Sequence, residues 1–158
     1  MTHSQTLIAL AVSLGGLLAA PAFAQTAAAP LATTAAPAAP AGLYQALGEK
    51  PGITRLVDDF VNRVVKDPRI GGHFKDTKPV ALKESLTDQI CQLSGGPCKY
   101  EGADMKSAHA DMDINKGHFN ALVEVLQSAM DAQGIPFAQQ NRLLALLAPM
   151  HRDVITKH

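Results

Sequence analysis

The residues of this chain that could do chemistry are few: six histidines, two cysteines and a set of carboxylates that all lie after residue 48. The sequence contains no phosphate-binding P-loop, no Gly-x-Ser-x-Gly nucleophile motif, no His-Glu-x-x-His zinc motif and no dinucleotide-binding fingerprint. No motif by itself therefore indicates an enzyme class, and the histidines and cysteines have to be judged by their positions.

The histidines differ in their surroundings. Five lie at the ends of the chain or beside polar and charged neighbours: His3, His73, His118, His151 and His158. His109 instead ends the short segment 104–109, just ahead of an apolar helical stretch. From position alone a structural or solvated histidine is favoured over a metal or cofactor ligand, and both interpretations remain open.

The two cysteines lie close together in the sequence. Cys91 and Cys98 are separated by six residues that include Gly95-Gly96-Pro97. In an oxidising compartment we expect a disulfide between them, worth about 2–3 kcal/mol in the chain-entropy model. Two buried free thiols are the alternative. A third hypothesis is a Cys2His2 metal site with His109 and His118, although the spacing matches no zinc pattern.

The first third of the chain differs in composition from the rest, since no charged residue precedes Glu49. Residues 6–20 are apolar and lead to Ala22-Phe23-Ala24, a small-x-small triplet typical of signal-peptide cleavage. We therefore expect a signal peptide over residues 1–24, an Ala/Pro-rich linker over residues 25–42, and secretion across the inner membrane to the periplasm. An uncleaved anchor is the alternative, and only then is a membrane contact expected.

Residues 43–158 have the pattern of one helical domain. Apolar residues recur at spacings of three and four over residues 53–65, 82–93, 119–130 and 143–154. Prolines, glycines and one asparagine mark helix starts and ends: Pro51, Pro68, Pro79, Gly95-Gly96-Pro97, Asn115, Gly134 and Pro136. The last predicted helix starts at Pro136 and includes Val154. We predict an all-α domain with about four main helices. Its 14 basic and 14 acidic residues balance, so nucleic acid is not an expected partner.

A set of short stretches in this domain occurs in a characteristic order: Leu43-Tyr44-Gln45-Ala46-Leu47-Gly48, Val57-Asp58-Asp59-Phe60, Asp67-Pro68-Arg69, Phe74, Thr77, Leu82-Lys83, Gly95-Gly96-Pro97, Tyr100, Gly102, Met105-Lys106, Ala108-His109, Ile114, His118-Phe119 and Leu147-Ala148-Pro149. This ordered set resembles the truncated (2-on-2) globins, most closely their first group. No single stretch is specific, whereas the ordered set is. The resemblance covers essentially the whole globular part of the chain.

The resemblance implies a b-type haem, with its iron, between the helix that carries Leu82 and the segment that ends at His109. It places His109 at the proximal iron ligand, with Nε2 toward the iron and the other ring nitrogen donating to a backbone carbonyl. His118 is not the ligand in this family. Haem contacts are implied for a wider set: Phe74, Thr77, Leu82, Lys83, Leu86, Tyr100, Met105, Phe119, Leu122 and Val123.

The sequence departs from the family on the distal side of the haem. Many group members have a tyrosine where this chain has Val61, and relatives often have glutamine where it has Leu82 and Leu86. We expect these three to form the distal pocket, with Gln89, or failing that Ser85, as a replacement donor. Because bound O₂ is polarised and gains about 1.5–3 kcal/mol from a donor, losing it should raise O₂ dissociation about tenfold or more. CO and NO are less polar and should be affected less.

Three functions are compatible with the sequence. The leading one is a haem protein that binds diatomic gases (O₂, NO, CO) at an iron ligated by His109. The second is an NO dioxygenase or peroxidase-like enzyme, which would need a separate reductase or electron-transfer partner. The third is a haem-free helical interaction module held by a Cys91–Cys98 disulfide.

Overall fold

The computed structural model describes residues 39–157. The predicted signal peptide (1–24) and most of the predicted linker (25–42) lie outside the described residues. Within residues 39–157 all regular structure is helical, which confirms the predicted all-α class. None of the helices in this range is long and apolar enough to cross a membrane.

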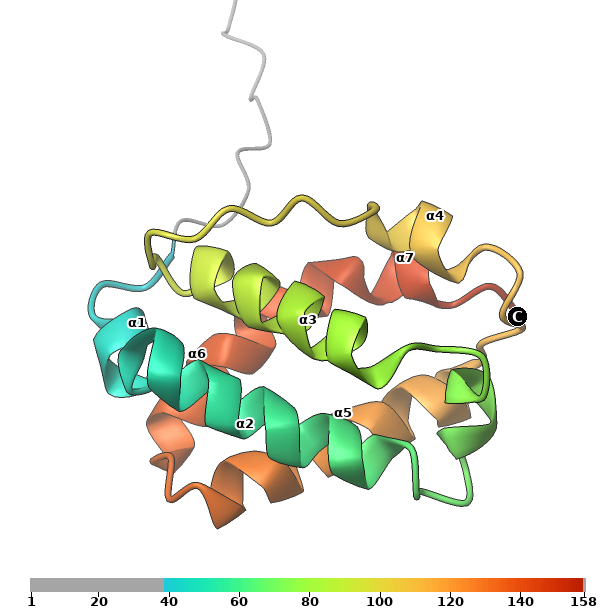
Figure 1. Cartoon of the computed structure of the whole chain (residues 1–158), viewed down its shortest axis with the longest axis horizontal. Helices are drawn as coiled ribbons and strands as arrows, with labels where there is room; N and C mark the ends of the chain where they lie inside the picture. Colours follow the sequence, from blue (N-terminus) through green and yellow to red (C-terminus); the bar gives the residue numbers. More distant parts are fainter. Residues whose placement is uncertain (1–38, 158) are drawn as a thin grey trace, which may run out of the picture. The chain divides into compact units, whose positions relative to one another are not determined.

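Between residues 39 and 157 the helical segments follow in this order: α1 (Leu43–Ala46), α2 (Glu49–Val64), η1 (Gly71–Phe74), α3 (Pro79–Leu93), α4 (Met105–His109), α5 (Lys116–Ala132), α6 (Phe137–Leu147), η2 (Ala148–Met150) and α7 (His151–Val154). Helix α2 packs against both α3 and α5, and α4 lies beside α7 (Figure 1). A long extended segment joins α3 to α4 along one edge of the domain (Figure 1).

Helix α2 is the centre of the packing because its apolar residues recur every three or four positions. Its fully buried side chains include Ile53, Leu56 and Val57, which meet Met130 of α5 and Leu143 of α6 in the core. The corner between α1 and α2 requires Gly52, since a Cβ there would lie 2.1 Å from the Leu47 carbonyl oxygen. The sequence therefore sets both the buried face of α2 and its tight entry.

The last helix is not continuous, in contrast to our prediction of one helix from Pro136 to Val154. The chain forms α6, then the 3-10 turn η2, then α7. Pro149 explains the break, because it has no N–H to continue the α-helical ladder and its ring crowds the preceding turn. The break brings the side chain of Met150 into the wall of the cavity described next.

Candidate functional site

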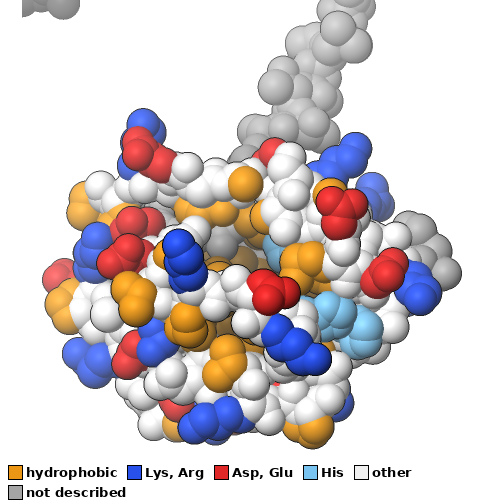
Figure 2. Space-filling view, turned by 45° about the vertical axis from the view of Figure 1, so that its right-hand side comes forward, with side chains coloured by type: hydrophobic (Ala, Val, Ile, Leu, Met, Phe, Trp, Pro, Cys, Tyr) orange, Lys and Arg blue, Asp and Glu red, His pale blue; other side chains and the backbone are white. Residues whose placement is uncertain are grey.

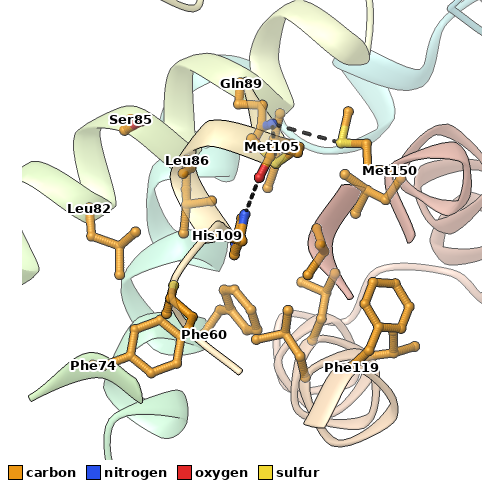
Figure 3. A pocket seen from close by; sticks show the side chains of 18 of the residues that line it. Phe60, Phe74, Leu82, Ser85, Leu86, Gln89, Met105, His109, Phe119 and Met150 are labelled. Carbon is orange, nitrogen blue, oxygen red and sulfur yellow. Dashed lines mark hydrogen bonds between the residues drawn. The ribbon is translucent and has the colours of Figure 1, made fainter. Parts of the chain in front are cut away.

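A cavity of about 820 Å³ lies among α3, α4, α5 and the η2–α7 segment. Apolar side chains form most of its wall: Phe60, Phe74, Leu82, Leu86, Phe119, Leu122 and Val123. The volume falls in the range of pockets that hold drug-sized ligands or cofactors. Figure 2 shows a hollow in the surface with hydrophobic side chains in and around it, and Figure 3 shows the lining residues from close by.

His109 supplies the one imidazole in the cavity wall as far as the structure describes the chain. Its Nδ1 lies 2.7 Å from the carbonyl oxygen of Met105, one helical turn earlier. Because a carbonyl can only accept, Nδ1 carries a proton and donates it, so in the neutral ring Nε2 is the nitrogen available to a metal. The ring is therefore held in the tautomer that an iron ligand requires.

The short helix α4 that presents His109 is fixed at its start by a side-chain cap. The Asp104 carboxylate accepts hydrogen bonds from the Ser107 backbone N–H (2.9 Å) and the Ser107 hydroxyl (2.7 Å). The backbone hydrogen bond from Ser107 holds the pKa of Asp104 below its usual value. The charged cap thus stabilises a helix of only five residues.

The ligands available to a metal ion at this site are few among the described residues. These residues contain no group of three or more His, Cys, Asp or Glu side chains arranged around a common point. Cys91 and Cys98 are joined by a disulfide, so the predicted alternatives of free thiols and of a Cys2His2 site with His109 and His118 are wrong. A metal at His109 would need a cofactor that brings its own ligands.

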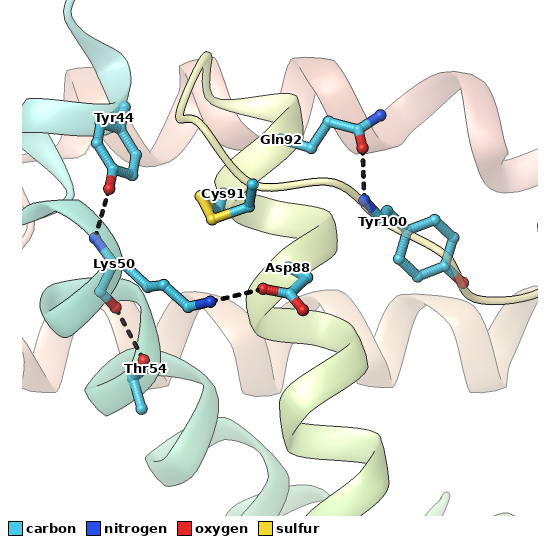
Figure 4. A network of polar contacts seen from close by, with 8 residues as sticks. Tyr44, Lys50, Thr54, Asp88, Cys91, Gln92 and Tyr100 are labelled. Atoms are coloured by element: carbon cyan, nitrogen blue, oxygen red, sulfur yellow. Dashed lines mark hydrogen bonds and ion pairs between the residues drawn. A yellow bond between two sulfur atoms is a disulfide. The ribbon is translucent and has the colours of Figure 1, made fainter.

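The disulfide anchors the segment that leads from α3 to the cavity (Figure 4). Cys91 is fully buried, and Gly96 passes so close that a Cβ would lie 2.7 Å from the Cys91 sulfur. Further along, the Tyr100 backbone N–H donates to the Gln92 side-chain oxygen (2.6 Å) and the Tyr100 hydroxyl donates to the Ala103 carbonyl (2.7 Å). These contacts place Tyr100 at the cavity wall, as the resemblance implied.

Of the three aliphatic residues expected on the distal side, two line the cavity and one does not. Leu82 and Leu86 line the cavity, together with Phe60, which sequence analysis did not assign to the pocket. Val61 does not line it: successive helical residues point about 100° apart, and Val61 lies in the core with 1% of its surface exposed. The predicted distal role of Val61 is therefore corrected to a packing role.

The two predicted hydrogen-bond donors on α3 are Ser85 and Gln89, and both line the cavity. The Nε2 of Gln89 donates to the sulfurs of Met105 (3.7 Å) and Met150 (3.8 Å) (Figure 3). The place of Met150 in the cavity wall was not predicted from the sequence, because it depends on the break in the last helix.

Lys83, expected at the haem edge, points elsewhere. Its ammonium group lies 2.6 Å from an Asp58 carboxylate oxygen and donates to the Asn62 side chain at 3.1 Å. Both partners belong to α2, so the lysine ties α3 to α2 and is not among the cavity-lining residues. The remaining predicted contacts, Phe74, Thr77, Met105, Phe119, Leu122 and Val123, do line the cavity.

Two histidines next in sequence to two of the cavity's aromatic residues contact each other. His73 Nε2 lies 3.1 Å from His118 Nδ1, and the ring centroids are 4.6 Å apart. His73 precedes Phe74 in η1, and His118 precedes Phe119 in α5, where its backbone N–H is capped by Asn115 (2.9 Å). Burial lowers the pKa of His73, and the charge of protonated His118 lowers it further.

Helices enclosing an apolar cavity with one oriented imidazole in its wall form the architecture of a globin. A family model described as bacterial-like globin matches residues 42–156, and the chain belongs to this family. It is similar to the group 1 truncated hemoglobin GlbN of Mycolicibacterium paratuberculosis, at 30% identity over 119 residues that cover 75% of this chain and 88% of that protein. It is also similar to the crystal structure of truncated hemoglobin from Tetrahymena pyriformis in the Fe(III) form, with a TM-score of 0.70 and 29% identity over 73% of this chain and 98% of that chain.

These similarities confirm the predicted 2-on-2 globin fold. Haem is the cofactor that membership of this family implies, and the cavity fits it. The wall is mainly apolar, the volume is that of a cofactor site, and a single oriented imidazole is available where a porphyrin would supply the other iron ligands. The hypothesis of a haem-free interaction module is therefore wrong.

Proposed function

We propose that this protein is an exported haem protein in which His109 Nε2 ligates the iron, and that it holds CO and NO better than O₂. Haem-based gas binding follows from the family. The observation that carries the proposal is the geometry of His109, whose Nδ1–H is engaged by the Met105 carbonyl at 2.7 Å while Nε2 remains free to act as a ligand.

The proximal side of the proposed site is built to hold a ligand nitrogen in one orientation. A carbonyl that accepts the Nδ1 proton fixes the ring and raises the basicity of Nε2. The Asp104 cap holds the first turn of α4, from which that carbonyl projects. Haem supplies the iron chemistry when bound, and the protein supplies the position and basicity of the nitrogen.

The opposite wall supports the preference among gases. Phe60, Leu82 and Leu86 present hydrocarbon to the cavity, and the side chain of Ser85 is the polar exception beside them on α3. The amide of Gln89 on the same helix is engaged by two sulfurs. O₂ needs a donor to neutralise the negative charge it acquires on binding, whereas CO and NO need it much less.

Two features support export to the periplasm. Residues 1–24 have the composition of a signal peptide. The Cys91–Cys98 disulfide would persist in an oxidising compartment and not in a reducing cytosol. Sequencing the N-terminus of the protein from a periplasmic fraction tests this part of the proposal: a mature chain starting at Gln25 supports it, and a full-length chain in the cytosol contradicts it.

Replacing the proposed ligand and restoring it from solution tests the haem assignment. His109→Gly should lose stoichiometric haem, and added imidazole should restore a Soret band because a small imidazole can take the vacated position. His151→Ala is the matched control, since His151 packs against the Phe119 ring (4.7 Å between centroids) without lining the cavity. Unchanged haem content in His109→Gly would refute the ligand assignment.

A further inference from the structure

Gln89 is a buried polar side chain inside an apolar cavity. Only 7% of its surface is exposed. A buried amide N–H is costly unless it finds an acceptor, and the acceptors it finds are two thioether sulfurs, Met105 Sδ at 3.7 Å and Met150 Sδ at 3.8 Å. Thioether sulfurs are weak hydrogen-bond acceptors, so the two contacts contribute little free energy. Their main effect is to fix where the Gln89 amide and the two methionine side chains lie.

Met105 contacts Gln89 and His109 through two different groups. Its side chain accepts from Gln89, and its backbone carbonyl accepts from His109 Nδ1 at 2.7 Å. The path from α3 to the imidazole is therefore continuous: the Gln89 amide, the Met105 sulfur, the Met105 carbonyl and the His109 ring (Figure 3).

Helix α4 lies beside α7, but it is short and depends on further contacts to hold its position. It has five residues, and none of them is fully buried. Met150, in η2, accepts from the same amide nitrogen, so the Gln89 side chain joins α3, α4 and η2. A helix this short moves easily unless a neighbouring element fixes it.

We propose that Gln89 is a positioning residue for the proximal histidine, acting through Met105 to fix the carbonyl that orients the His109 ring. The inference rests on the proposed haem ligation. It replaces our sequence-based expectation that Gln89 donates to the bound gas, because the Gln89 amide nitrogen already donates to the two sulfurs. Helix α3, which carries the predicted gas-side residues Leu82 and Leu86, thereby also sets the orientation of the His109 ring.

The test is the Fe–His stretching band in the resonance Raman spectrum of the ferrous, gas-free holoprotein. Gln89→Leu and Met105→Leu should each shift this band to lower frequency and broaden it, because a displaced carbonyl weakens the hydrogen bond to Nδ1. The double variant should shift it no further than one single variant, since both remove the same contact. Haem loss should accelerate several-fold in the single variants.

Gln140→Leu is the matched control. Gln140 is also buried (3% exposed) and its Nε2 also makes two hydrogen bonds, to Asp131 (2.7 Å) and to the Ile135 carbonyl (2.9 Å), but it does not line the cavity. It should lower stability and leave the Raman band in place. An equal shift in Gln140→Leu would reduce the effect of Gln89 to general loosening and overturn the proposal.

The remaining outcomes separate the inference from the proposed function. An unchanged band in Gln89→Leu with faster O₂ dissociation would make Gln89 a donor to the gas and overturn the positioning role. An unchanged band with unchanged gas kinetics would overturn it as well. Absence of haem from the unaltered protein would instead refute the proposed function itself.

Discussion

Adding a hydrogen-bond donor to the apolar wall should slow O₂ dissociation sharply. Leu86 lines the cavity from α3 beside Leu82 and Phe60. Glutamine is close to leucine in size, so Leu86→Gln places an amide N–H at this wall without filling the cavity. The variant therefore tests directly whether the protein holds O₂ weakly for want of a donor.

The size of the effect follows from the strength of one hydrogen bond. An amide that donates to a partly charged oxygen contributes about 1.5–3 kcal/mol. If the whole bond is lost when O₂ leaves, the dissociation rate constant falls by a factor of about 10 to 150. CO dissociation should change far less, because bound CO carries little negative charge.

Stopped-flow displacement of O₂ by excess CO measures the O₂ dissociation rate constant, and displacement of CO by excess NO measures the CO dissociation rate constant. Leu86→Met is the control, since it conserves volume and adds no donor, and its O₂ rate should stay close to that of the unaltered protein. The reasoning is refuted if Leu86→Gln and Leu86→Met behave alike. It is also refuted if the unaltered protein already holds O₂ as tightly as Leu86→Gln.

The other predictions concern the contacts that hold the cavity together. Cys98→Ser should lower the free energy of unfolding by about 2.5 kcal/mol, from the loop closed by a disulfide with a sequence separation of 7, and denaturant titration with and without reductant measures it. Because burial lowers the pKa of His73 in the folded protein, the unfolded chain takes up the proton first, and the free energy of unfolding should fall as pH drops below about 6.5. His73→Phe should flatten that pH dependence, and thermal melts from pH 8 to pH 5 would show it. Asp104→Ala should fray α4 and speed haem transfer to an acceptor globin several-fold, whereas Asp104→Asn, which can still cap, should have a smaller effect; equal rates in the two variants would contradict a capping role.

Local sequence signals were sufficient for the main helices. Proline at the start of α3, asparagine before α5 and the glycines after α3 and α5 act within one helical turn, through missing donors, side-chain caps and left-handed backbone. The cavity-lining residues between Phe74 and Val123 were predicted in another way, from the resemblance to the globins. That resemblance depends on the order of short stretches along the chain. The ligand role of His109 was predicted from that order and not from the surroundings of His109 itself.

The sequence did not predict the contacts of side chains that could reach more than one partner. Val61 follows Phe60 on the same helix, and only the packing of α2 against its neighbours decided which of them would face the cavity. Lys83 could have reached the cavity mouth but is drawn to Asp58 on the adjacent helix. Gln89 was expected to face the gas and instead donates to two sulfurs from distant parts of the chain.

By itself, then, the sequence determined the helical class, the helix boundaries set by proline, glycine and asparagine, and the family, because all of these depend on residues close together or on their order. Only the tertiary structure decided the break that turns Met150 into the cavity and the partners of Lys83 and Gln89 on α3. Those outcomes depend on which acceptors lie within about 3–4 Å of a donor after packing. The distance between a donor and an acceptor after packing cannot be read from the spacing or the composition of the sequence.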